Sequence, residues 1–94
     1  MYFIVTCIDK PDHTQLRIDT RSAHIDYLSQ FEQHVVMAGP LLSDDESAMV
    51  GSMLIIDMPD RQQLDQFLAN DPYQQAGLFE RVTVTKWRKT LPAA

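Results

Sequence analysis

The sequence has only one cysteine, Cys7, among its 94 residues. A single cysteine cannot form a disulfide within the chain, which predicts a protein of a reducing compartment. Cys7 also lies in an apolar run, where a cysteine is more often a buried hydrophobe than a nucleophile. No stretch reaches the roughly 18 consecutive apolar residues of a membrane-spanning helix, and the first residues do not form a secretion signal. We therefore predict a cytoplasmic protein with no membrane partner.

Basic residues are also few: the chain has 8 Lys and Arg against 13 Asp and Glu, a formal net charge of −5. An excess of negative charge repels a polyanion, so this composition argues against a nucleic-acid partner. The apolar share of 45% is ordinary for a globular protein. At this length we expect residues 1–94 to form a single domain.

Motifs for metals and common cofactors are missing. The histidines lie about ten residues apart, at His13, His24 and His34, without the paired His or Cys spacing of zinc sites. There is also no glycine-rich phosphate loop, no nucleophile elbow and no dinucleotide fingerprint. The sequence thus predicts no metal and no cofactor.

The order of predicted elements is β-α-β-β-α-β. Strands are expected over residues 2–8, 34–38, 49–58 and 80–87, and helices over 14–33 and from Asp60, as N-cap, to Asn70. A break in the first helix near Asp19-Thr20 is left open, and Gly39-Pro40 is expected to close the second strand. This order predicts a ferredoxin-like α+β fold, a four-stranded antiparallel sheet with both helices on one face.

Two of the predicted strands are apolar on both faces. Residues 2–8 and 53–56 are apolar at nearly every position instead of alternating with polar residues. A second copy of the sheet would cover the face opposite the helices, because a two-fold dimer needs only one self-complementary patch. The alternative is that a few exposed apolar residues are ordinary. We predict a homodimer.

The first predicted helix carries a row of residues with chemical potential. Arg17, Arg21, His24 and Leu28 follow one another at steps of four, three and four, so they share one side of the helix. The arginines could line a pocket that attracts an anion such as a carboxylate. Alternatively, they pair at the surface with nearby acids, namely Asp9, Asp12 or Asp19.

His24 is the residue in this row that can take and return a proton near neutral pH. The alternative is a packing role, which is more common for a lone histidine beside an apolar face. Asp71 precedes Pro72, so its carboxylate is expected to cap a short turn that Gly77 ends. A capping carboxylate is fixed well enough to orient an imidazole, but periodicity does not show whether Asp71 meets His24.

Two glycine dipeptides, Gly39-Pro40 and Gly51-Ser52, flank the connection between the middle strands. One interpretation is turn geometry. The other is close approach of the backbone to a ligand, with the Ser52 hydroxyl as a hydrogen-bond donor.

Four segments, taken in order, resemble the YciI-like (YCII-related) family. They are residues 20–28 with Arg21-x-x-His24, residues 38–41 with Ala-Gly-Pro, the pair 51–52, and residues 70–78 with Asp-Pro-Tyr-x-x-Ala-Gly. The match runs from Tyr2 to about Lys89. The resemblance implies a ferredoxin-like chain that pairs into a dimeric α/β barrel.

The resemblance also implies a small-molecule pocket with His24 and Asp71 as a catalytic dyad. Residues that match other motif positions, and would line or shape the pocket, are Arg21, Gly39, Pro40, Ser52 and Tyr73. The helical row adds Arg17 to these candidate substrate-binding residues.

Some proteins similar to this family eliminate halide from chlorinated aromatic compounds, and the wider superfamily includes muconolactone isomerases. The resemblance therefore implies a lyase or isomerase in which His24, oriented by Asp71, removes a proton from a small anionic cyclic substrate. Arg21 and Ser52 would stabilise the developing negative charge. The alternative is a non-catalytic dimeric module that binds a small metabolite or serves a regulatory interaction.

Overall fold

The computed structural model describes residues 1–93, so Ala94 at the end of the predicted domain lies outside the described residues. Strands β1, β3 and β4 and helices α1 and α2 occur where the sequence predicts them, with ends shifted by a few residues. The elements are β1 (Tyr2–Asp9), α1 (Thr14–Gln30), β2 (Val35–Leu42), β3 (Met49–Asp57), α2 (Arg61–Ala69), α3 (Pro72–Gln75) and β4 (Phe79–Trp87).

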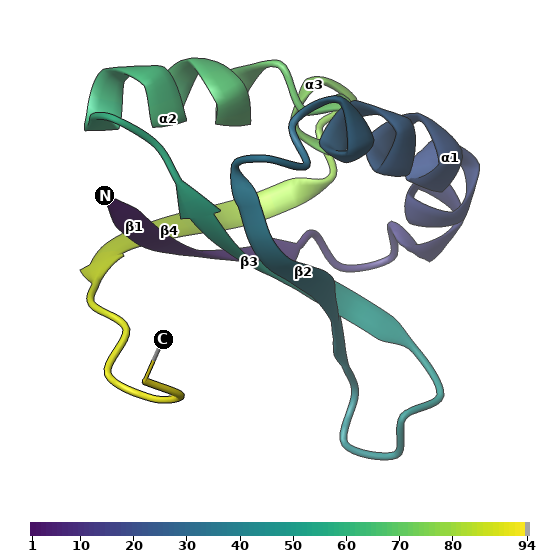
Figure 1. Cartoon of the computed structure of the whole chain (residues 1–94). Helices are drawn as coiled ribbons and strands as arrows, with labels where there is room; N and C mark the ends of the chain where they lie inside the picture. The colour runs from purple at the N-terminus through teal and green to yellow at the C-terminus, as the bar shows by residue number, and fades with distance from the viewer. Residues whose placement is uncertain (94) are drawn as a thin grey trace.

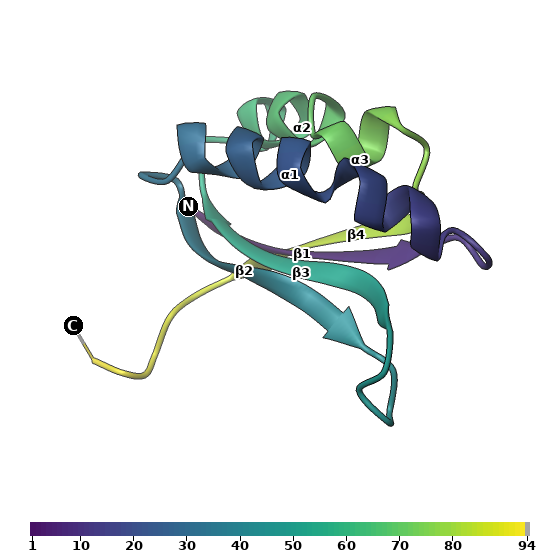
Figure 2. The ribbon, with the colours of Figure 1, turned by 90° about the vertical axis from the view of Figure 1, so that its right-hand side faces the viewer.

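The strands form an antiparallel sheet in the order β2-β3-β1-β4. All three helices lie over one face of this sheet, and the opposite face carries no helix (Figure 1, Figure 2). The ferredoxin-like α+β fold predicted from the element order is therefore confirmed. No helix within residues 1–93 combines the length and apolar character needed to cross a membrane.

The core lies between the sheet and the helices. Alternate residues of β1, namely Phe3, Val5 and Cys7, are buried against this side because successive strand residues point to opposite faces. In the register of β1 with β3, Cys7 pairs with Ser52. The apolar core therefore ends, at this point of the sheet, next to a buried hydroxyl.

On the other face of the sheet, β1 and β3 carry mainly apolar residues, while β4 contributes Thr83 and Thr85. Tyr2, Ile4 and Ile8 are only partly buried there, and Ile4 pairs with Ile55 across the strands. No helix within residues 1–93 covers this side (Figure 2). The apolar character of the strands on both faces thus corresponds to a helix-covered face and an open one.

The predicted turn at Gly39-Pro40 is wrong, because β2 continues through both residues to Leu42. Pro40 pairs with Ser52 on β3. A proline is tolerated here because β2 is an edge strand with a neighbour on one side only, so a residue whose N–H would point away from β3 needs no donor. The chain instead reverses in an acidic loop after Leu42, where Asp45 accepts hydrogen bonds from Ser43 and Ser47.

Gly51 also lies inside a strand, not in a turn, so the turn interpretation of Gly51-Ser52 is wrong as well. A Cβ atom at this position would overlap the carbonyl oxygen of Cys7 on the neighbouring strand. Only glycine therefore allows β1 and β3 to approach each other here, directly beside Ser52.

Helix α1 is continuous through Asp19-Thr20 and ends at Gln30, three residues short of the predicted end. Backbone hydrogen bonds of a turn replace the helical pattern after this point, since the Phe31 carbonyl accepts from both His34 and Val35. This turn leads the chain directly into β2. It places β2 alongside the C-terminal half of the helix.

The caps of the two later helices are confirmed. Asp60 caps α2 by accepting from the Gln63 N–H at 2.8 Å, and Asp71 caps α3 by accepting from the Tyr73 N–H at 2.9 Å. Gly77 follows α3 with φ of 78°, a conformation that favours glycine. These caps fix where Asp71 and Tyr73 stand, directly beside α1.

Candidate active site

A cleft of about 160 Å³ opens between α1 and the strands β2 and β3. The row predicted on α1 forms one side of it. The lining consists of Arg17, Arg21, His24, Ile25, Leu28, Ala38, Gly39, Pro40, Met49, Ser52, Leu54 and Tyr73. The structure thus brings together seven of the eight candidate site residues in the lining itself, and the eighth, Asp71, stands behind His24.

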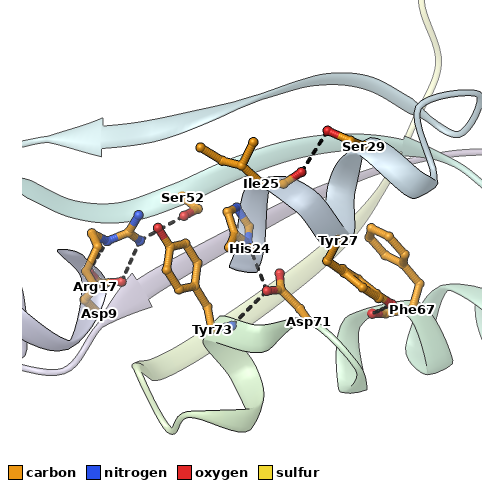
Figure 3. A network of polar contacts seen from close by, with 10 residues as sticks. All are labelled: Asp9, Arg17, His24, Ile25, Tyr27, Ser29, Ser52, Phe67, Asp71 and Tyr73. Carbon is orange, nitrogen blue, oxygen red and sulfur yellow. Dashed lines mark hydrogen bonds and ion pairs between the residues drawn. The ribbon is translucent and has the colours of Figure 1, made fainter. Parts of the chain in front are cut away.

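The imidazole of His24 meets the carboxylate of Asp71. His24 Nδ1 lies 2.9 Å from Asp71 Oδ1, and the two residues are only 8% and 2% exposed. The same oxygen accepts the capping N–H of Tyr73, so two donors hold the carboxylate in place (Figure 3). A carboxylate only accepts hydrogen bonds, so Nδ1 carries the proton. Nε2 of the neutral ring is therefore unprotonated.

Tyr73 fixes the plane of this imidazole. Its ring stacks on His24 with centroids 4.0 Å apart and an interplanar angle of 19°. The guanidinium carbon of Arg17 lies 4.6 Å from the Tyr73 centroid, and Figure 3 shows Tyr73 between Arg17 and His24. Burial raises the pKa of Tyr73, although the nearby Arg17 and Arg21 charges act in the opposite direction. Tyr73 is therefore a neutral phenol at physiological pH.

Arg17 forms a two-point ion pair with Asp9. Its Nε lies 2.7 Å from Asp9 Oδ2, its Nη2 lies 2.9 Å from Asp9 Oδ1, and Nη2 also donates to Ser52 Oγ at 2.9 Å. Burial lowers the pKa of Arg17, but the hydrogen bond and charge of Asp9 outweigh burial and raise it overall. The guanidinium is thus permanently charged, with Asp9 as its counterion.

The alternative that the two arginines pair with nearby acids at the surface is therefore wrong for Arg17. Its partner is one of the acids considered, Asp9, but the pair is buried, with Arg17 only 2% exposed. The bend of the chain after β1 turns this end of the strand toward the start of α1, which removes the pair from water. Asp19 instead accepts from Gln15 on the same helix.

Arg21 differs from Arg17 because it is exposed and has no acidic partner within residues 1–93. Asp9 cancels the charge of Arg17, and Asp71 lies beside the imidazole. Arg21 is therefore the positive charge that an anion entering the cleft would meet first.

Sequence reasoning missed part of the site. Asp9 was considered only as a surface partner, and the apolar lining residues Ile25, Met49 and Leu54 were not predicted. Ile25 lies one position after His24, outside the predicted row, and nothing local places Met49 and Leu54 opposite α1. Burial raises the pKa of Cys7 to about 12, so this thiol stays protonated in the core. Residues 1–93 contain no cluster of three or more His, Cys, Asp or Glu side chains arranged to hold a metal ion.

Residues 1–88 match the family model of the YCII-related domain. The chain belongs to this family. Among curated relatives, an uncharacterized protein of Haemophilus influenzae is 29% identical over 95% of this chain and 98% of its own length. The YciI protein of Escherichia coli is 27% identical over the same shares.

Solved structures extend the comparison of this YCII-related domain. It is similar to 5-chloro-2-hydroxyhydroquinone dehydrochlorinase (TftG) from Burkholderia phenoliruptrix, solved in complex with 2,5-dihydroxybenzoquinone. The TM-score is 0.89 and the identity 33%, over 96% of each chain. SnoaB, a cofactor-independent oxygenase from Streptomyces nogalater, shares 12% identity with a TM-score of 0.57 over 97% of this chain and 95% of its own. That second likeness concerns the fold alone.

The motif segments of this YCII-related domain come from four different elements. His24 is on α1, Gly39 and Pro40 are on β2, Ser52 is on β3, and Asp71 and Tyr73 belong to the start of α3. They meet at one cleft because α1 lies over β2 and β3 and packs against α3. Residues spread along the sequence therefore face a single cleft, except Asp71, which stands behind His24.

Proposed function

We propose that this protein is a small enzyme, a lyase or isomerase, that moves a proton on a small anionic cyclic substrate bound in the cleft. The observation that carries the proposal is the contact of His24 Nδ1 with the buried Asp71 carboxylate at 2.9 Å. Because this contact holds the proton on Nδ1, the neutral ring presents Nε2 as a base. A positioned base of this kind accelerates proton transfer by about 10²- to 10⁴-fold.

The size and lining of the cleft support a cyclic substrate. A volume of about 160 Å³ is close to the cavity of about 150 Å³ that suffices for benzene. Apolar side chains such as Ile25, Leu28 and Leu54 would contact the ring. The polar groups, in contrast, come from His24, Ser52 and the arginines. Such a lining fits a ring with oxygen substituents at its edge.

Removal of a proton leaves negative charge on the substrate, which the remaining polar groups would stabilise. The Ser52 hydroxyl can donate a hydrogen bond to a substrate oxygen, and Arg21 supplies a positive charge at the mouth. A leaving group such as chloride would depart with its bonding electron pair, while His24 retains the proton. An isomerase would instead return that proton at another carbon.

The likeness to the dehydrochlorinase decides which substrate to test first. The wild-type protein should be incubated with 5-chloro-2-hydroxyhydroquinone, and released chloride should be measured by ion chromatography. If the protein is a lyase, we expect the rate of chloride release to increase in proportion to the enzyme concentration. If it is an isomerase, we expect the product to contain deuterium when the reaction runs in D₂O. Tight binding of 2,5-dihydroxybenzoquinone without turnover or exchange in any assay would support the non-catalytic binding module instead.

Arg21→Gln tests the anionic character of the substrate. We expect this variant to bind 2,5-dihydroxybenzoquinone about 3- to 10-fold more weakly, because an exposed charge contact contributes roughly 1 kcal/mol. Affinity should also depend less on salt, since screening acts on the lost interaction. Isothermal titration calorimetry at two salt concentrations measures both effects.

The control for this substitution is Arg61→Gln on α2. Arg61 pairs with Asp65 on the surface and does not line the cleft. Arg61→Gln removes the same charge from the protein as Arg21→Gln. An equal loss of affinity in both variants would mean that Arg21 acts only through the net charge.

We further propose that the open face of the sheet forms a homodimer. The supporting observation is the partly exposed apolar row that includes Tyr2, Ile4 and Ile8, on a side with no helix within residues 1–93. In Ile4→Lys we expect a monomer, because a lysine at the centre of this face would have to be buried without a partner. Light scattering after gel filtration should give twice the 10.8 kDa chain mass for the wild type.

Ile18→Lys is the matched control. Ile18 is an exposed apolar residue of α1, on the other side of the sheet, and its replacement should leave the dimer intact. A wild-type protein that stays monomeric at high micromolar concentration would overturn the proposed dimer.

A further inference from the structure

We propose that Asp9 is a positioning residue of the cleft that acts through Arg17 to fix the hydroxyl of Ser52 as a donor toward the substrate. The proposal rests on the proposed function, since it concerns an oxygen of the ligand in the same cleft. It assigns a role to Asp9, an acid that does not line the cleft.

Arg17 is bound by Asp9. Both carboxylate oxygens of Asp9 accept from it, at 2.7 and 2.9 Å, and both side chains are nearly inaccessible to solvent. The charge of Arg17 is thus already compensated, and one edge of its planar guanidinium group is occupied by Asp9. Arg17 is therefore not the group that attracts an anion into the cleft, although it lines it.

Arg17 makes a further hydrogen bond, in which its Nη2 donates to Ser52 Oγ at 2.9 Å. In this bond the serine oxygen accepts, so the hydroxyl proton of Ser52 points elsewhere. Within residues 1–93 no acceptor for this proton is found, although Ser52 is only 3% exposed and lines the cleft. A hydroxyl that accepts from a charged donor is itself a stronger donor. A substrate oxygen is the acceptor that this arrangement lacks.

Asp9 is needed to keep Arg17 in the position from which it donates to Ser52. Without a counterion, the buried guanidinium would turn toward the ligand or toward water, because an unpaired buried charge is costly. The two bonds to Asp9 hold the guanidinium plane, and this plane fixes the direction of Nη2 toward Ser52. The Tyr73 ring, 4.6 Å from the guanidinium carbon, limits its movement from the side.

The cleft therefore contains two chains of contacts, each beginning with a buried aspartate. Asp71 fixes His24 as a proton acceptor, and Asp9, through Arg17, fixes Ser52 as a hydrogen-bond donor (Figure 3). The first chain would remove the substrate proton. The second would stabilise the oxygen on which negative charge develops, without transferring a proton itself.

A double-mutant cycle of Asp9→Asn and Ser52→Ala tests the proposal, with the dissociation constant of 2,5-dihydroxybenzoquinone measured by calorimetry. We expect each single variant to bind about 10-fold more weakly, the typical effect of losing a hydrogen bond to a charged ligand. The double variant should bind no more weakly than Ser52→Ala alone, because Asp9 acts only through Ser52. Losses that multiply to about 100-fold in the double variant, or an unchanged constant in Asp9→Asn, would overturn the proposal.

A purely structural role of Asp9 would give a different result. In that case Asp9→Asn would lower the melting temperature, and it would weaken binding by the same factor in the wild-type protein and in Ser52→Ala. Asp65→Asn is the matched control, because it breaks an exposed Arg–Asp pair of the same kind. It should leave the dissociation constant unchanged.

Because Asp9→Asn leaves a buried arginine without its counterion, which destabilises the fold, Arg17→Lys is the second variant. An ammonium keeps the charge beside Asp9 but cannot form the fork that reaches both Asp9 and Ser52. It should also weaken binding about 10-fold and show no further loss when combined with Ser52→Ala. Multiplying losses would again overturn the proposal.

The two proposals fail in different ways. The cycle measures binding and needs no turnover, so loss of coupling between Asp9 and Ser52 contradicts this inference alone. Full turnover by a protein that lacks His24 contradicts the proposed function alone. Absence of any binding of 2,5-dihydroxybenzoquinone by the wild-type protein would overturn both proposals.

Discussion

His24→Gln should lower kcat for chloride release by about 10²- to 10⁴-fold, the usual contribution of a positioned general base. Glutamine can still donate to Asp71, so the buried carboxylate keeps a partner and the fold is retained. It cannot, however, accept a proton from the substrate at neutral pH. Binding of 2,5-dihydroxybenzoquinone should change far less than kcat, because the arginines and Ser52 are untouched. Steady-state kinetics and calorimetry on the same preparation separate the two effects.

His13→Gln provides the matched control for this substitution. The His13 ring is half-buried and contacts the Pro11 carbonyl, outside the cleft. Its replacement should leave kcat unchanged. A His24→Gln protein that retains kcat would show that His24 is not the base.

Asp71→Asn should also lower kcat by about 10²- to 10⁴-fold, by removing the negative charge that stabilises the imidazolium formed when His24 takes the substrate proton. The amide oxygen, in the place of Oδ1, can still accept from both the Tyr73 N–H and His24 Nδ1, so the cap of α3 is kept. The protonated ring of His24 then has a neutral amide beside it instead of a carboxylate. Circular dichroism should show a folded protein, while chloride release is lost.

Asp60→Asn separates this effect from the loss of a cap. Asp60 caps α2 through the Gln63 N–H but contacts no histidine. Exchanging a capping aspartate for asparagine changes stability little. Asp60→Asn should therefore retain kcat. Equal losses in both variants would mean that Asp71 serves α3 and not the imidazole.

Much of the cleft follows from periodicity in the sequence. A step of three or four residues places Arg17, Arg21, His24 and Leu28 on one side of any α-helix, whatever that side packs against. Likewise, an aspartate before a proline predicts an N-cap, and Asp71 is one. Local chemistry decides such features, so the sequence alone predicts them.

The contact between His24 and Asp71 is different, because 47 residues separate them. It depends on how α1 packs against α3, which no local pattern determines, so only the resemblance to the family indicated it. Gly39-Pro40 illustrates the same limit. This dipeptide usually marks a turn, but an edge strand tolerates it, and the position of β2 at the edge is a property of the whole sheet. The burial of Asp9 is equally non-local.

The protonation pattern of the His24 ring tests most directly whether His24 is a base oriented by Asp71. Long-range ¹H–¹⁵N spectra of histidine-labelled protein report the proton on each ring nitrogen in the neutral form. We predict a protonated Nδ1 and a bare Nε2 for His24, and a selective shift of this Nε2 when 2,5-dihydroxybenzoquinone is added. His13 and His34, which lie outside the cleft, should not respond. A proton on Nε2, or a His24 signal that does not change when the ligand is added, would show that His24 is not such a base.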